Sequence, residues 1–108
     1  MIKLLFFLLL APVLAISDKQ CSSISIEKVN LCVELAISQR EKSKGLMYRK
    51  DLSNSDGMLF VCKNAGKRCM WMKNTYIPLD LGFFREDMTL IEVKELSPRS
   101  LNSVCSSE

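Results

Sequence analysis

The side chains best suited to chemistry lie around the only tryptophan of the chain. Polar groups set among apolar neighbours can fix the orientation of a ligand. We therefore predict a pocket for a small anionic or hydroxylated ligand, built from Arg49, Trp71, Lys73, Asn74, Thr75 and Asp80. In the alternative interpretation, Asn74 and Thr75 are turn residues that cap strand ends. Asp80 would then form an ion pair with Lys73 or Arg49.

Sulfur side chains in the same region favour a second interpretation, a periplasmic copper(I) carrier. Its ligands would be Met58, Cys69, Met70 and Met72. Thioethers and thiolates select copper(I), and residues two apart on a strand face the same side. Alternatively, the methionines fill gaps in a small core against the tryptophan ring. No cofactor is expected under the first interpretation. A structural zinc site is not expected either, because the sequence contains no Cys-x-x-Cys pair.

The chain contains no histidine, the usual general base near neutral pH. Serine and cysteine catalytic triads in their usual form are therefore excluded. Lys73 could act as a base only in its neutral form, which would require burial. A small hydrolase or transferase is thus the weaker alternative, and a non-catalytic module is preferred.

Five cysteines leave an odd thiol, which could stay free or bridge to another chain. Cys62 and Cys69 bracket a six-residue loop between an apolar strand and its expected hairpin partner. We therefore predict a disulfide between them. Cys21, Cys32 and Cys105 have no comparably placed partner, and a link between Cys21 and Cys105 is one option.

The first fifteen residues have the three regions of a signal peptide. Lys3 precedes the apolar run Leu4–Leu10, and small residues follow at Val13 and Ala15. We expect cleavage after Ala15 and export to the periplasm or beyond. The run is shorter than the roughly 20 residues of a membrane-spanning helix. Membrane attachment is therefore expected only if this segment stays uncleaved as an anchor.

Hydrophobic patterning divides the rest into a polar lead-in, 16–28, and one domain, 29–108. Period-two alternation and short apolar runs predict strands over 29–36, 58–62, 79–84 and 90–93. Ser38 and Glu41 form a capping box that begins a helix over 39–48. We expect a mainly β fold, a small compact sandwich or barrel with one short helix.

Without residues 1–15 the net charge is about +2, too weak to indicate a nucleic-acid partner. The expected partner is a small molecule or an envelope protein.

Four stretches then match a known family in order. They are Gly45–Arg49, Gly57–Val61, Trp71–Thr75 and Ile77–Asp80. In these the chain resembles the domain of unknown function 192 family, also called uncharacterised protein family 0127, over roughly Val29 to Leu101. The resemblance implies a small, mostly β, often exported bacterial or archaeal domain with no established activity.

Three features depart from that family. Cys62 stands where the family usually has an aromatic residue, and the turn at 85–88 lacks the common Asp-Gly pair. Met88 cannot adopt a positive φ without cost. Similar proteins also continue for about thirty residues past the position of Cys105, so a complete chain ending at Glu108 should lack its last strands and leave an open edge.

Overall fold

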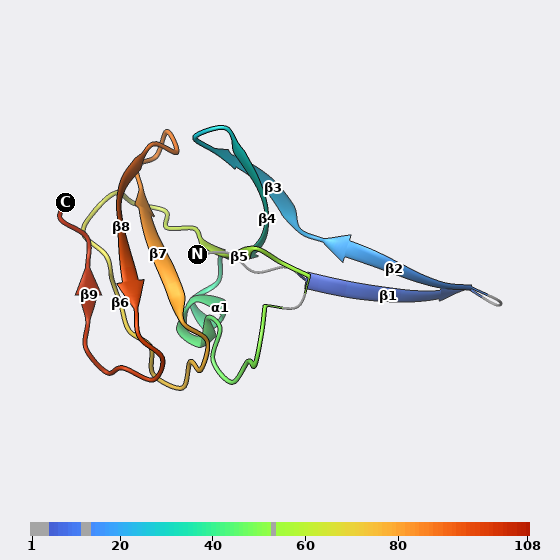
Figure 1. Cartoon of the computed structure of the whole chain (residues 1–108). Coiled ribbons are helices and arrows are strands. Elements are labelled where there is room, and N and C mark those ends of the chain that lie inside the picture. Colours follow the sequence, from blue (N-terminus) through green and yellow to red (C-terminus); the bar gives the residue numbers. More distant parts are fainter. Residues whose placement is uncertain (1–4, 12–13, 53) are drawn as a thin grey trace.

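The computed structural model describes residues 5–11, 14–52 and 54–108 (Figure 1). Strands β1 (Leu5–Ala11) and β2 (Leu14–Gln20) form an antiparallel hairpin that projects away from the other sheets. The predicted signal peptide falls largely on this hairpin, although residues 1–4 and 12–13 lie outside the described residues. Within the described part, no helix is long and apolar enough to cross a membrane. Export and cleavage after Ala15 stay predictions.

A three-stranded sheet contains β3 (Ser22–Ile26), β4 (Val29–Ala36) and β5 (Gly57–Phe60). Strand β4 is central, antiparallel to β3 and parallel to β5. The alternating residues of β4 form the predicted strand. Strand β3 lies in the expected polar lead-in, where serine and isoleucine also alternate. That period of two was the sequence signal for the additional strand.

Helix α1 (Gln39–Lys44) begins at the predicted capping box. The Ser38 hydroxyl accepts from the Glu41 amide at 3.1 Å, and the Ser38 amide donates to Glu41 Oε1 at 2.9 Å. The helix ends four residues earlier than predicted because Gly45 follows it with a φ of 49°. A glycine with positive φ is a common helix terminator, since other residues are strained there.

The second half of the chain holds two smaller sheets. Strands β7 (Leu79–Phe84) and β8 (Leu90–Leu96) form a predicted antiparallel hairpin, and β6 (Cys69–Met70) pairs with the C-terminal β9 (Val104–Cys105). In the β7–β8 turn, the Met88 amide donates to the Arg85 carbonyl at 2.9 Å. Met88 has a φ of 68°, so it adopts the conformation expected to be costly.

Two clusters of buried side chains form the core. One contains Met72, Leu81, Phe83 and Leu96, and the other contains Ala36, Leu46 and Met58. Leu79 packs against both and so joins them. The predicted class, mainly β with one short helix, is confirmed. The sheets of the described residues stay small and separate, and none closes into a barrel.

Candidate functional site

The C-terminal segment holds the loop that carries Trp71 at several points. The Met72 amide donates to the Ser100 carbonyl at 3.0 Å, and the Arg99 amide donates to the Thr75 carbonyl at 2.8 Å. Pairing of β6 with β9 continues this contact toward the N-terminal end of the loop. Main-chain bonds therefore position the predicted site residues of this loop.

Within this loop, some side chains are buried and others are exposed. Met72 and Thr75 are buried. The Thr75 amide donates to the Met72 carbonyl at 3.0 Å, and its hydroxyl donates to the Lys73 carbonyl at 3.1 Å. Thr75 is thus a turn-stabilising residue, as the alternative interpretation predicted. The turn leaves Trp71 and Lys73 facing solvent.

Tyr48 and Asn74 lock two distant loops together. The Tyr48 amide donates to the Asn74 carbonyl at 2.8 Å, and Asn74 Nδ2 donates to Tyr48 Oη at 3.0 Å. Both residues have positive φ, 66° and 54°. Such backbone strain costs about 1 kcal/mol or more per residue and clusters at functional sites. The Tyr76 ring meets the Tyr48 ring edge-on, with centroids 6.4 Å apart.

Three large aromatic side chains are exposed in these loops, Tyr48 by 62%, Trp71 by 47% and Tyr76 by 46%. Lys73 Nζ lies 5.3 Å from the centre of the Trp71 ring, a cation–π contact that keeps a positive charge beside it. We call Tyr48, Trp71, Lys73, Asn74 and Tyr76 the aromatic surface. Sequence reasoning missed Tyr48 and Tyr76 as site residues, although Tyr48 lies within the family-like stretch Gly45–Arg49 and Tyr76 lies between two others.

Arg49 and Asp80 do not join this group. Arg49 Nη2 lies 3.8 Å from Glu34 Oε1, and burial lowers the pKa of Arg49. Burial, and then the nearby Glu41 charge, raises the pKa of Glu34, while Lys44 lowers it. Asp80 is exposed on β7, directly opposite Glu95 of β8. The expected ion pair of Asp80 with Lys73 or Arg49 is not present among the described residues.

The proposed copper ligands are divided between core and disulfide. Met58 and Met72 are buried in different core clusters, and Met70 packs against the cluster of Met72. These contacts fit methionines that fill gaps in a small core. Cys69 forms a disulfide with Cys105, so in this state it has no thiolate to offer.

The predicted Cys62–Cys69 disulfide was wrong, as was the option of Cys21 with Cys105. Cys69 is bonded to Cys105 and Cys21 to Cys32, with Cα atoms 4.0 and 5.5 Å apart, while Cys62 is an exposed free thiol. The reason is strand pairing. Strand β5 pairs with β4, not with β6, and the β6–β9 register places Cys69 directly opposite Cys105.

Two hollows border these elements. A broad open cleft of about 1570 Å³ lies between the start of α1, the residues after β5 and strand β7, and both Cys62 and Cys69 line it. A smaller hollow of about 140 Å³ is bounded by Trp71 and Thr75 on one side and by α1 on the other. Lys42 and Lys44 of α1 border it, adding positive charge near the aromatic surface.

Comparison with known proteins gives a consistent result. The family model of domain of unknown function 192, described as Uncharacterized ACR, matches residues 22–108. The crystal structure of a candidate transcription regulator from Sinorhizobium meliloti 1021 has a TM-score of 0.72 at 34% identity, covering 80% of this chain and 70% of that one. A protein of unknown function from Novosphingobium aromaticivorans DSM 12444 has a TM-score of 0.70 at 24% identity, covering 94% and 74%, and shows the same fold. No curated protein matches the chain. The chain belongs to the domain of unknown function 192 family.

Proposed function

We propose that this chain is an exported, non-catalytic module of the cell envelope that binds a small hydroxylated ligand with an anionic group. A sugar that carries a carboxylate fits this description. The observation that carries the proposal is the aromatic surface. It combines three exposed rings with the Asn74 amide, which is bonded to Tyr48, and with the Lys73 cation, which lies against Trp71.

The side chains match such a ligand group by group. Ring faces of Trp71 and the two tyrosines can cover the apolar C–H faces of a sugar while their polar edges stay hydrated. The Asn74 amide and the tyrosine hydroxyls can bond to hydroxyl groups. Lys73 supplies a cation for the carboxylate, with Lys42 and Lys44 at the neighbouring hollow.

The cysteines support export. Disulfides form and persist in oxidising compartments, and strand register brings Cys69 opposite Cys105. Together with the signal-like residues 1–15, this favours the periplasm or the cell exterior. Mass measurement of the protein purified from its compartment tests the point, since the expected mature chain begins at Ile16.

Binding can be followed directly through Trp71, because it is the only tryptophan. Muropeptides with free carboxylates should quench or shift its fluorescence, and a neutral chitotetraose should do so more weakly. Tyr76→Ala should weaken binding of both by about tenfold, the loss expected if one ring contact contributes about 1.4 kcal/mol. Lys73→Ala should weaken only the carboxylated ligand.

Two variants serve as matched controls. Val93→Ala truncates an exposed apolar side chain on β8, and Lys63→Ala removes a cation outside the aromatic surface. Neither should change the affinity. If neither sugar perturbs Trp71 at millimolar concentration, or if the controls weaken binding as much as Tyr76→Ala, the proposal is wrong.

A further inference from the structure

We propose that Cys62 exchanges with the Cys69–Cys105 disulfide, so that the chain can interchange two disulfide pairings. The inference rests on the placement of three cysteines. Cys69 and Cys105 are bonded across β6 and β9, and Cys62 stays a free, exposed thiol. The inference does not rest on the proposed ligand binding.

The attacking thiol and its target share one cleft. Cys62 and Cys69 both line the broad cleft beside α1, and both are exposed. The six residues between them are exposed and belong to no helix or strand. A segment of this kind can rearrange to bring two cysteines to the 4.4–6.8 Å Cα separation that a disulfide needs.

The exchange needs no oxidant or reductant. Cys62 loses its proton to water and attacks Cys69 Sγ as a thiolate. The bond between Cys62 and Cys69 forms as the Cys69–Cys105 bond breaks, and Cys105 leaves as a thiolate that takes a proton. One disulfide and one thiol are present before and after the step.

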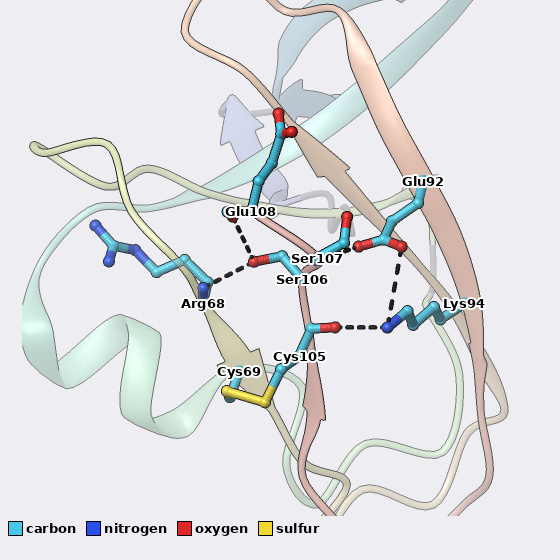
Figure 2. A network of polar contacts seen from close by, with 8 residues as sticks. All are labelled: Arg68, Cys69, Glu92, Lys94, Cys105, Ser106, Ser107 and Glu108. Atoms are coloured by element: carbon cyan, nitrogen blue, oxygen red, sulfur yellow. Dashed lines mark hydrogen bonds and ion pairs between the residues drawn. A yellow bond between two sulfur atoms is a disulfide. The ribbon is translucent and has the colours of Figure 1, made fainter.

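The docked C-terminal strand keeps the observed pairing in place. Lys94 Nζ donates to the Cys105 carbonyl at 2.6 Å, and the Arg68 amide donates to Ser106 Oγ at 3.0 Å (Figure 2). The Ser107 amide donates to Glu92 Oε1 at 2.6 Å from the neighbouring β8. These bonds hold Cys105 opposite Cys69, although β9 is only two residues long.

The entropy of loop closure favours the Cys62–Cys69 pairing over the observed one. Closing a loop with a sequence separation of 7 is about tenfold more favourable than closing one of 36, the separation of Cys69 and Cys105. Loosening β9 should therefore shift the pairing toward Cys62–Cys69. The released segment also supports the Trp71 loop, through the Ser100 and Arg99 hydrogen bonds, so the exchange would loosen that loop as well.

The test is to map which cysteine is alkylated in the native, oxidised protein. A low concentration of iodoacetamide lets exchange precede trapping, and acid quenching before digestion stops further exchange. We expect most label on Cys62 and a smaller fraction on Cys105. Ser106→Ala, which removes one bond to the docked strand, should raise the Cys105 fraction at least about threefold, because a looser β9 favours the shorter loop.

Controls separate exchange from other chemistry. Cys62→Ser should abolish label on Cys105, and Lys50→Ala, an exposed substitution away from β9, should leave the fraction unchanged. Label confined to Cys62 in both the wild type and Ser106→Ala would overturn the proposal. Label on Cys105 that persists in Cys62→Ser would also overturn it. So would label on Cys21 and Cys32 equal to that on Cys105, because this would indicate general disulfide scrambling.

Discussion

Replacing Met88 by glycine and by alanine should show whether the β7–β8 turn holds a strained residue. Met88 has a φ of 68°, whereas Glu86, two positions earlier, has a negative φ. Both variants remove the Met88 side chain and its contacts. Their difference in stability therefore reports the backbone conformation and not the lost packing.

The expected magnitude follows from two opposing effects. An alanine with left-handed backbone costs about 1–2 kcal/mol in the folded state. Glycine loses about 0.5–1 kcal/mol more in backbone entropy on folding. Met88→Gly should thus be more stable than Met88→Ala by about 0.5–1 kcal/mol. At Glu86 only the entropy difference applies, so Glu86→Ala should be more stable than Glu86→Gly by a similar amount.

Urea unfolding followed by Trp71 fluorescence would measure all four variants, with stability taken from the midpoint and slope. The decisive result is the change of sign between the two positions. If alanine is at least as stable as glycine at position 88, Met88 does not hold a left-handed backbone in solution, and the assignment of turn strain is refuted.

Two further experiments test the disulfide and the helix cap. The double variant Cys69→Ser, Cys105→Ser should lose about 3–4 kcal/mol in the same unfolding assay because it releases a long loop, while Cys62→Ser should stay near wild type. Ser38→Ala should cost about 1 kcal/mol by removing the helix cap. Hydrogen bonds from Ser38 lower the pKa of Glu41, so their stabilisation is present above the ordinary glutamate pKa and is lost as the pH falls through the lowered value. Ser38→Ala keeps the Ser38 and Ile37 amide donors to Glu41 and removes only the side-chain contribution, so its stability should depend slightly less on pH in the acid range than that of the wild type.

Local patterns accounted for much of the fold. The capping box at Ser38, the alternation in β4 and the β7–β8 hairpin involve residues close together in the sequence, where propensity and periodicity act directly. The serine and isoleucine alternation in β3 is an equally local signal, although this strand lies in the segment expected to be a polar lead-in. The strain at Met88 was also foreseeable, because the turn lacks a glycine.

Pairing between distant segments could be decided only by the tertiary structure. Strand β5 pairs in parallel with β4, and β9 returns to β6, so Cys69 meets Cys105 instead of Cys62. In the same way, Tyr48 joins Asn74, which lies 26 residues later. The sequence alone determined which side chains were available, their local elements and the resemblance to a family. Their grouping depended on which strand edges and core faces bury best together, a free energy that is shared by the whole chain and is not encoded in any one segment.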